Sequence, residues 1–394
     1  MAIETNGGAL NGSVSHNKVA PAPLDASKLK ITLTDFPKSL QRPEELRFGQ
    51  TYSDHMLIVS FDPVTGWSTP EIKPYGPLSL EPSSSCFQYC TNVFEGMKAY
   101  VGPDGKPRLF RPELNMRRLE RSAGRFVLPP FDGDELLKMI KRFVQIDSRW
   151  IPNREGHSLY LRPTIIGTRT ALGVMASESA MLYVIATPSG PYFPQGLRPI
   201  SLLGVKDTVR AWPGGTGGHK VGGNYAPGLL PQKIAAENGY EQVLWLFGDD
   251  NRVTEAGVMN FFVIVKREND DGLDVITPPL NGTILPGITR DSCLALASSP
   301  SFQESNSFRL HTHELEFTMA DLAEWSAQGR LLEALSVGTA AIIASVDRIG
   351  FEGKDITLPS YKAGMGPVGW ALREKIVAIQ EGREEWEGWS VVCD

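Results

Sequence analysis

Short apolar runs that alternate with amphipathic segments constrain the fold of this chain more than any other feature of its sequence. Runs such as HMLIVSF at 55–61, MLYVIAT at 181–187 and NFFVIV at 260–265 have the length and composition of strands. Between the first two, DGDELLKMIKRFVQI at 132–146 begins with an acidic turn and places apolar residues on one helical face: Leu136, Leu137, Ile140 and Val144. The sequence therefore predicts a mixed fold of the α/β or α+β class.

A segment rich in proline and glycine, PSGPYFPQGLRPI, interrupts this pattern at 188–200. We therefore expect a small domain at 29–192, an interdomain loop at 193–207 and a larger domain at 208–394. The composition of residues 1–28 predicts a disordered N-terminal segment. This segment contains no arginine, includes Glu4 and Asp25, and lacks the apolar stretch of a secretory signal, so we expect a cytoplasmic protein.

Charge and composition argue against several classes of function. With 39 Lys and Arg against 45 Asp and Glu, the net charge is -6, which disfavours a nucleic-acid partner because phosphate binding depends on clustered cations. The longest apolar runs are far shorter than the roughly 20 residues that span a bilayer. The four cysteines, Cys86, Cys90, Cys293 and Cys393, lack the spacing of a zinc site or a disulfide scaffold. We expect reduced thiols and no metal site.

One lysine, Lys220, lies among six glycines in ten residues in the segment GGTGGHKVGGNYAPGL at 214–229. Glycine is unfavourable where backbone freedom is not needed, so this density predicts a backbone pressed closely against something. A nucleotide phosphate loop requires glycine before the lysine and Ser or Thr after it, but His219 and Val221 occupy these places. The third glycine of a dinucleotide fingerprint is also missing. Read alone, the segment also fits a surface loop with an incidental lysine.

Six segments together resemble one enzyme family. FEGMKAY, LFRPELNMRRLERSA, SLYLRPTIIG, GHKVGGNYAPGLLPQ, EQVLWLFGDDNRVTEAGVMNFFV and PPLNGTILPGITRDS are similar to the branched-chain amino acid aminotransferases, and the resemblance runs from about residue 45 to residue 390. It implies a pyridoxal 5'-phosphate enzyme of fold type IV, with a small N-terminal α/β domain and a larger C-terminal domain joined by a loop. It also implies that Lys220 is catalytic and holds the cofactor as a Schiff base.

The resemblance assigns the other cofactor contacts to residues of suitable chemistry. Glu255 lies between two apolar runs, where a carboxylate needs a cationic partner, and the resemblance implies the pyridinium nitrogen. Tyr225 corresponds to the tyrosine at the phenolic oxygen, and Arg118 to the phosphate arginine, with Arg117 facing solvent. Backbone N–H groups at a helix start and a turn hydroxyl complete the phosphate site: Ile288, Thr289 and Thr339. Taken singly, these phosphate residues also fit ordinary capping or turn chemistry.

The substrate site must accept branched aliphatic side chains and also glutamate, which requires an apolar pocket with one cation. Tyr160 and Arg162 lie two residues apart in an expected strand, so their side chains share a face. The resemblance implies that Arg162 binds the distal carboxylate of glutamate. It places ten residues in the pocket: Tyr52, Tyr89, Phe94, Tyr160, Arg162, Val174, Tyr192, Val258, Met259 and Ala340. Any one aromatic among them could equally be a core residue.

Two positions depart from the family's pattern. Val258 stands where the family usually has threonine, and Leu335 and Ser336 stand where a late turn usually begins Phe-Gly. Both changes bear on the preferred amino acid and leave the cofactor chemistry intact.

These features predict the transfer of an amino group between branched-chain L-amino acids (leucine, isoleucine and valine) and 2-oxoglutarate by a ping-pong mechanism. The expected partners are small-molecule amino acids and 2-oxo acids, with no nucleic acid and no membrane, in a homodimer whose loops help close each other's sites. Two alternatives remain open. One is a related transaminase of larger or specialised amino acids, D-amino acids or amines, and the other is a binding module without the cofactor.

Overall fold

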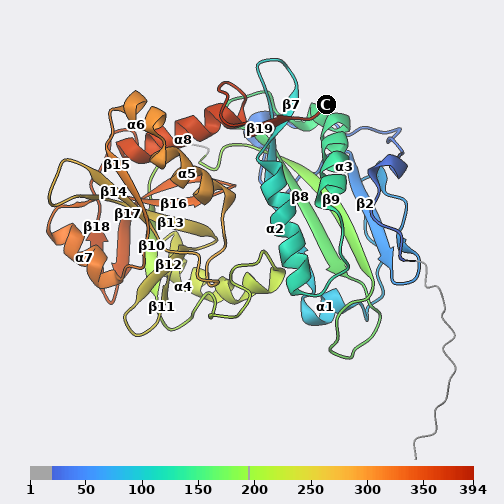
Figure 1. Cartoon of the computed structure of the whole chain (residues 1–394), viewed down its shortest axis with the longest axis horizontal. Coiled ribbons are helices and arrows are strands. Elements are labelled where there is room, and N and C mark those ends of the chain that lie inside the picture. The colour runs from blue at the N-terminus through green and yellow to red at the C-terminus, as the bar shows by residue number, and fades with distance from the viewer. Residues whose placement is uncertain (1–19, 194–195) are drawn as a thin grey trace, which may run out of the picture.

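The computed structural model describes residues 20–193 and 196–394, which form two lobes (Figure 1). The sequence predicted that residues 1–28 are disordered. Positions 1–19 lie outside the described residues, and for positions 20–28 the prediction is wrong. Ala22 forms a bridge with Gly66, Leu24 is buried, and helix η1 spans Ala26–Lys28. Because Leu24 joins the core of the first lobe, this part of the N-terminal segment is fixed to the fold.

The first lobe is built on a ten-stranded sheet whose central strands are long apolar runs. The strands pair in the order β1-β4-β2-β9-β8-β6-β7-β19, while β3 pairs with β2 and β5 with β8. The antiparallel pairing of β8 with β9 runs from Ser158–Ser189 to Gly167–Ala180. The strand bounds are β1 Lys30–Ile31, β2 His55–Asp62, β3 Gly66–Trp67, β4 Glu71–Pro74, β5 Asn92–Phe94, β6 Met97–Val101, β7 Pro107–Phe110, β8 Ser158–Gly167, β9 Ala180–Ser189 and β19 Ser390–Val392.

The helix expected at 132–146 is confirmed as α3, Gly133–Ile146. The Asp132 carboxylate caps it by accepting two backbone N–H groups, and Leu136, Ile140 and Val144 are fully buried. Burial of one such side chain stabilises the fold by about 1.5 to 3 kcal/mol, so this face holds α3 against the core. The lobe's other helices are η2 Pro43–Glu45, α1 Ser85–Tyr89, α2 Pro112–Arg125 and η3 Ser148–Trp150.

The second lobe contains a nine-stranded sheet that closes on itself. Its order is β12-β11-β10-β17-β16-β13-β14-β15, and β12 also pairs with β13, so six strands form a ring. β18 extends the sheet by pairing with β17. The bounds are β10 Ile200–Val205, β11 Gln242–Phe247, β12 Arg252–Ala256, β13 Met259–Lys266, β14 Leu273–Thr277, β15 Leu310–Glu314, β16 Leu331–Gly338, β17 Ile342–Phe351 and β18 Lys354–Thr357.

Two large apolar clusters connect the helices of this lobe to its sheet, and a small third cluster joins α4 to β11. One cluster joins α5 and α8 to β13 and β16, and includes Phe262, Leu296, Leu335 and Ile376. The other includes residues of α7 together with the interior of the ring. The helix bounds are η4 Gly222–Asn224, η5 Ala226–Gly228, α4 Leu229–Glu237, α5 Ile288–Ser298, α6 Pro300–Asn306, α7 Met319–Ala327 and α8 Pro367–Gln380.

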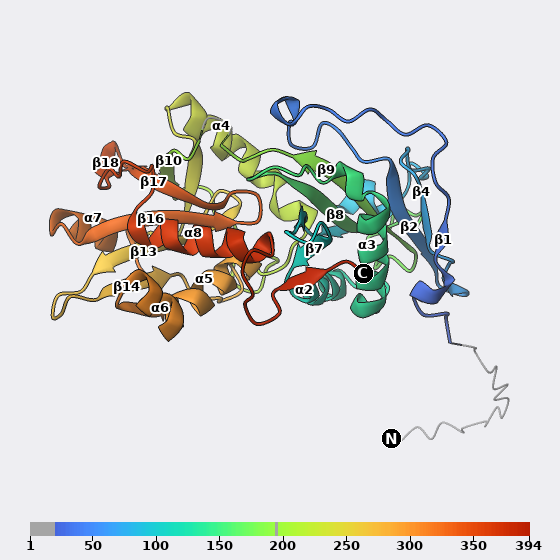
Figure 2. The ribbon, with the colours of Figure 1, turned by 90° about the horizontal axis from the view of Figure 1, so that it is seen from above.

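The expected domain bounds need two corrections. The segment 193–207 is not all loop, because Ile200–Val205 forms β10, one of the six strands of the ring, which pairs with β11 and β17. The C-terminal end of 208–394 does not stay with the second lobe, because β19 pairs with β7 in the first sheet (Figure 2). There Trp389 packs edge-on against Phe110, with 5.8 Å between ring centres, which explains why the chain returns.

The mixed α/β class is confirmed by these two sheets and their helices. No helix in the described ranges is long and apolar enough to cross a membrane. The same residues contain no group of three or more His, Cys, Asp or Glu side chains that could hold a metal ion.

Candidate active site

The lysine segment lies between the two lobes and is fixed to the first. The backbone N–H of Lys220 donates to Ser122 Oγ on α2 at 3.0 Å, and its carbonyl accepts from the N–H of Phe94 at 3.1 Å. The glycines serve this close approach, as expected. A Cβ atom on Gly222 would lie 2.1 Å from Asn92 Oδ1. The backbone of this segment therefore positions Lys220 against β5 and α2.

The Lys220 side chain is enclosed by aromatic rings and by other cations. Its Nζ lies 3.2 Å from Tyr225 Oη and 5.0 Å from the centre of the Phe94 ring. Burial, and then the neighbouring Arg118 and Arg162, lower the pKa of Lys220 to about 8, while burial raises the pKa of Tyr225 to about 12. A fraction of this amine is therefore neutral at physiological pH, and an uncharged tyrosine hydroxyl lies beside it.

Glu255, on β12, has the cationic partner that its apolar surroundings required. One carboxylate oxygen accepts from Asn260 Nδ2 at 3.0 Å and from the N–H of Leu285 at 3.2 Å, and the other oxygen pairs with Arg210. That second oxygen has no aligned hydrogen-bond donor among the described residues. Burial raises the pKa of Glu255 to about 6, against the opposing effect of Arg210. Arg210 lies 45 residues earlier, and no local sequence pattern marks it as the partner of Glu255.

Arg118, on α2, is buried in an ion pair with a second carboxylate that the sequence analysis did not identify. Its Nε and Nη2 donate to the two oxygens of Glu95 at 2.6 and 2.7 Å, and its Nη1 donates to the carbonyl of Pro286 at 2.9 Å. Three of the five N–H donors of a guanidinium are thus used, which leaves two for a ligand. The neighbouring Arg117 is exposed, as expected.

The N-terminus of α5 lies beside Arg118 as a consequence of the bond to Pro286. Ile288 and Thr289 are buried in its first turn, and the N-cap residue Gly287 offers no capping side chain. A cavity of about 330 Å³ is lined by Arg118, Gly287 and Ile288 among others. Free N–H groups at a helix start beside a guanidinium form a site suited to an anion such as phosphate.

Thr339 and Ala340 lie in the turn between β16 and β17, where Thr339 is half-buried and Ala340 is exposed. Met259 is buried beneath this turn, because a Cβ atom on Gly338 would lie only 3.0 Å from Met259 Cγ.

Phe94, Tyr160 and Arg162 form one wall beside the lysine. Arg162 lies over the Phe94 ring at 4.7 Å from its centre and donates from Nη2 to Tyr160 Oη at 3.1 Å. The shared face expected of Tyr160 and Arg162 is therefore confirmed. Phe94 in turn lies 5.1 Å from the Tyr225 ring. Phe48, which the sequence analysis did not single out, packs edge-on against Tyr160 at 4.9 Å and extends the wall.

The remaining residues expected in the substrate pocket lie farther out. Val258 is 67% exposed and lines a small cavity with Tyr225 and Arg210. Among the contacts of the described residues, none joins four of the expected residues to Lys220: Tyr52, Tyr89, Val174 and Tyr192. The structure thus brings together the lysine, the two ion pairs, the helix start and the aromatic wall, and leaves these four at the periphery.

Known proteins are similar to this chain both in sequence and in architecture. The family model for amino-transferase class IV matches residues 92–328. The chain is 44% identical to the mitochondrial branched-chain-amino-acid aminotransferase of Schizosaccharomyces pombe, covering 94% of this chain and 86% of that one. It is 45% identical to the cytosolic branched-chain-amino-acid aminotransferase of Saccharomyces cerevisiae, covering 95% of this chain and 99% of that one.

Among solved structures, the branched-chain amino acid aminotransferase of Escherichia coli superposes with a TM-score of 0.67 at 25% identity, covering 86% of this chain and 99% of that one. The expected fold type IV is thus confirmed by sequence and by architecture. Pyridoxamine 5'-phosphate is bound in another solved branched-chain amino acid aminotransferase, which superposes with a TM-score of 0.66 at 26% identity and covers 86% of this chain and 98% of that one. The chain therefore belongs to the class IV aminotransferases, in the family of the branched-chain-amino-acid aminotransferases.

Proposed function

We propose that this protein transfers amino groups between leucine, isoleucine or valine and 2-oxoglutarate, with pyridoxal 5'-phosphate as its cofactor. The observation that carries the proposal is Lys220, a lysine whose pKa burial lowers to about 8, placed between a buried carboxylate and an anion site. When bound, the cofactor supplies an aldehyde that takes up the amino group and a ring that accepts electrons. The following residues supply the binding and the proton transfer.

The donors and acceptors around Lys220 suit each part of the cofactor. Arg118 has two N–H donors left for phosphate, and the uncapped start of α5 adds the N–H groups of Ile288 and Thr289. We propose that the Thr339 hydroxyl, in the turn between β16 and β17, joins them. The Glu255 oxygen that lacks an aligned donor can accept a hydrogen bond from a protonated ring nitrogen. Tyr225 Oη, already within reach of Lys220, can donate to the phenolic oxygen.

Lys220 also suits the proton transfer that transamination requires. An amine can remove a proton from the substrate's α-carbon only when it is neutral, and general bases work best with a pKa near the working pH. Burial and the neighbouring arginines bring Lys220 into this range. The hydrogen bond to Tyr225 fixes the direction of the amine.

The wall beside Lys220 supports dual recognition of apolar and acidic substrates. Phe94 presents apolar surface, while Arg162 retains a buried Nε without a partner among the described residues. We propose that Arg162 binds the distal carboxylate of glutamate. The exposure of Val258 supports a second candidate, a transaminase whose range extends to larger or specialised amino acids, because one side of the pocket is open there.

We also propose a homodimer. An apolar surface group surrounds the short helix α1 and the loop between β8 and β9: Phe87, Tyr89, Leu172, Val174 and Met175. The Tyr89 hydroxyl bonds to the carbonyl of Leu172, which joins the two segments. Exposed apolar side chains gathered in this way mark protein interfaces, and we propose that a second copy of this chain covers them. A fully active monomer in sedimentation would contradict this.

A cytoplasmic location is also our proposal, supported by the similarity to the cytosolic enzyme of Saccharomyces cerevisiae. The relatives named above include one mitochondrial and one cytosolic enzyme. Imaging of a C-terminal fusion decides between these compartments.

One experiment tests the central function. The purified holoenzyme should show a visible absorption band and should transaminate leucine with 2-oxoglutarate. Lys220→Ala should lose the native band and the activity, whereas Lys233→Ala, an exposed lysine on α4, should keep both. Full activity in Lys220→Ala would end the proposal.

A further inference from the structure

Lys98 is an ammonium group that reaches from the first lobe to the second. It lies on β6 and donates from Nζ to the carbonyl oxygen of Ala340 at 2.8 Å. Lys98 pairs with Tyr160 across the sheet, and directly opposed residues project from the same face. Lys98 therefore lies on the face of the sheet that presents Tyr160 and Arg162 to the site.

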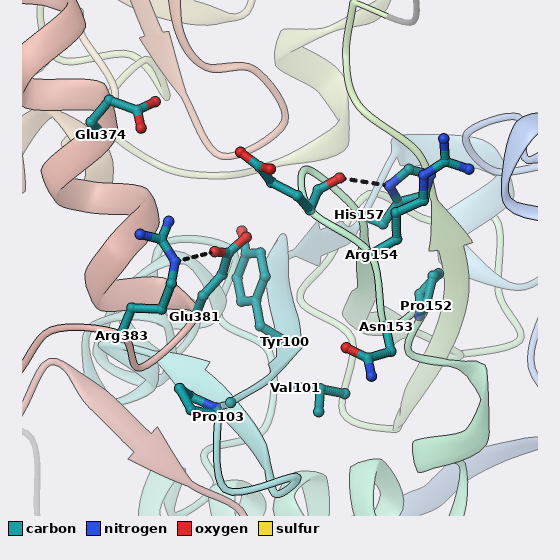
Figure 3. A pocket seen from close by; sticks show the side chains of 12 residues that line it. Tyr100, Val101, Pro103, Pro152, Asn153, Arg154, His157, Glu374, Glu381 and Arg383 are labelled. Atoms are coloured by element: carbon teal, nitrogen blue, oxygen red, sulfur yellow. Dashed lines mark hydrogen bonds and ion pairs between the residues drawn. The ribbon is translucent and has the colours of Figure 1, made fainter.

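No described carboxylate lies within ion-pair distance of Lys98. Burial, and then the positive charge of Arg373, lower the pKa of Lys98 to about 8. Lys98 and Arg373 share a cavity of about 220 Å³ with Glu381. Glu381 is already held by Arg383 at 2.8 Å, a pair that Figure 3 shows in an adjoining pocket. Tyr100 and Tyr192, the other titratable groups of this cavity, bring no charge near neutral pH. A partly buried cation without a counter-charge is unfavourable, so the Ala340 carbonyl is its main partner.

The turn that Lys98 contacts has an unusual conformation. Ile342, which ends the turn, has a φ angle of 65°, a region that β-branched residues rarely adopt. Such a conformation persists only where the surrounding structure holds it, and it is common at functional sites. The cavity behind the turn leaves room on that side, and Lys98 reaches across it to Ala340.

The hydrogen bond to Ala340 also determines where neighbouring donors point. The carbonyl and N–H of one peptide plane point in opposite directions, so the Ala341 N–H points away from Lys98. The backbone N–H groups of Thr339, Ala340 and Ala341 have no hydrogen-bond acceptor among the described residues. A cation bound to the carbonyl polarises the peptide and strengthens its N–H as a donor. The turn therefore offers free donors whose direction depends on Lys98.

We propose that Lys98 is a positioning residue for the substrate's α-carboxylate: it holds the Thr339–Ala341 turn so that the turn's N–H groups bind that carboxylate. This inference rests on the proposed function, since it concerns the same site. Among the described residues, the hydrogen bonds and ion pairs of Lys98 include no contact with Lys220, Arg118 or Tyr225. It acts through the turn, from the opposite lobe.

Substrate affinity in the holoenzyme tests the proposal. In Lys98→Met we expect the KM values for leucine and its 2-oxo acid to rise about tenfold, the effect of one charge-assisted hydrogen bond, while kcat changes less than about threefold. Lys98→Arg keeps the charge and should restore most of the affinity. Lys106→Met, an exposed lysine in the adjacent hairpin, should match the wild type.

A binding measurement separates this role from a general structural one. Spectral titration with 4-methylvaleric acid should show the same tenfold loss in Lys98→Met, whereas the neutral 4-methylvaleramide, which lacks the carboxylate charge, should bind as it does to the wild type. Equal losses for acid and amide, unchanged affinity for the acid, or loss of the bound cofactor would each overturn the proposal. An inactive wild-type holoenzyme would instead refute the proposed function.

Discussion

The ion pair between Glu95 and Arg118 should be among the most sensitive points of the first lobe. Glu95 is fully buried, and its oxygens accept from Arg118 Nε and Nη2 and from Asn115 Nδ2 at 2.6 to 2.8 Å. Glu95→Leu removes these acceptors and leaves the Arg118 charge buried with only the Pro286 carbonyl. Removing one partner of a buried pair costs about 3 to 5 kcal/mol, and we expect this loss in the free energy of unfolding.

This loss corresponds to a large shift in melting temperature. For a unit of about 150 to 250 residues, each kcal/mol lowers the midpoint by about 2 to 4 °C, so the first lobe should melt about 6 to 20 °C earlier. Differential scanning calorimetry of the cofactor-free protein measures this directly. The two lobes should be fitted as separate transitions, because a protein with two cores need not unfold in one step.

The double variant Glu95→Leu with Arg118→Met provides the matched control. It removes both charges and fills the space with apolar groups, which is often nearly neutral for stability. We therefore expect most of the lost stability to return, while affinity for the phosphate of the cofactor remains low because the guanidinium is absent. A Glu95→Leu midpoint within about 2 °C of the wild type, or a double variant less stable than the single one, would refute this reasoning.

Four further expectations follow from the site. Glu255→Gln should keep the cofactor bound but lower kcat by at least about a hundredfold, since the ring nitrogen loses its anionic partner; an unchanged kcat would assign Glu255 a structural role only. Arg162→Gln should raise KM for glutamate and 2-oxoglutarate about tenfold to hundredfold and leave leucine nearly unchanged, and steady-state kinetics would contradict this if all three rose equally. Val258→Thr should alter the ranking of leucine, isoleucine and valine by about 1 to 3 kcal/mol at most, and an identical ranking in a donor panel would exclude Val258 from specificity. Finally, burial lowers the pKa of Lys220 from its ordinary 10.5 to about 8 in the folded protein, so the charged amine destabilises the fold below pH 8. This destabilisation disappears as the pH rises from 8 to 10.5. Urea unfolding of the cofactor-free protein should therefore find Lys220→Met more stable than the wild type at pH 7 and nearly equal to it above pH 10.

Local patterns predicted the parts of the fold whose signals lie within one segment. The α3 helix follows from the Asp132 cap and the period of Leu136, Ile140 and Val144, all within fifteen residues. The common face of Tyr160 and Arg162 follows from the period of a strand. The bounds of β10 and the pairing of β19 were missed because strand partners are set by the folded topology. Nothing near residue 390 indicates a pairing with β7, which lies about 280 residues earlier.

The partners of the buried charges were missed for the same reason. The position of Glu255 between apolar runs required a cation, but any of several arginines would have met that need, and the folded chain supplies Arg210. Glu95 occurs in a segment quoted for its resemblance, yet its role depends on Arg118, 23 residues later on a helix. Phe48 carries no pattern that separates it from other exposed aromatic residues. In each case the missing information is a contact between segments that only packing determines.

One contact of the buried charges, in contrast, is short in sequence and is determined by a single turn. Glu255 and Asn260 face each other because β12 and β13 form a tight hairpin, in which Gly257 adopts a φ angle of 57°. Glycine is the residue that most readily adopts this conformation, and the two-residue turn determines that position 255 pairs with position 260. The Asn260 amide therefore reaches the Glu255 carboxylate, and its second bond, to the carbonyl of Leu285, ties the hairpin to the segment that leads into α5. The hairpin thus couples the proposed ring-nitrogen carboxylate to the proposed phosphate site, so Asn260→Ala should weaken cofactor affinity as well as kcat, whereas loss of kcat alone would show that the two sites are positioned independently.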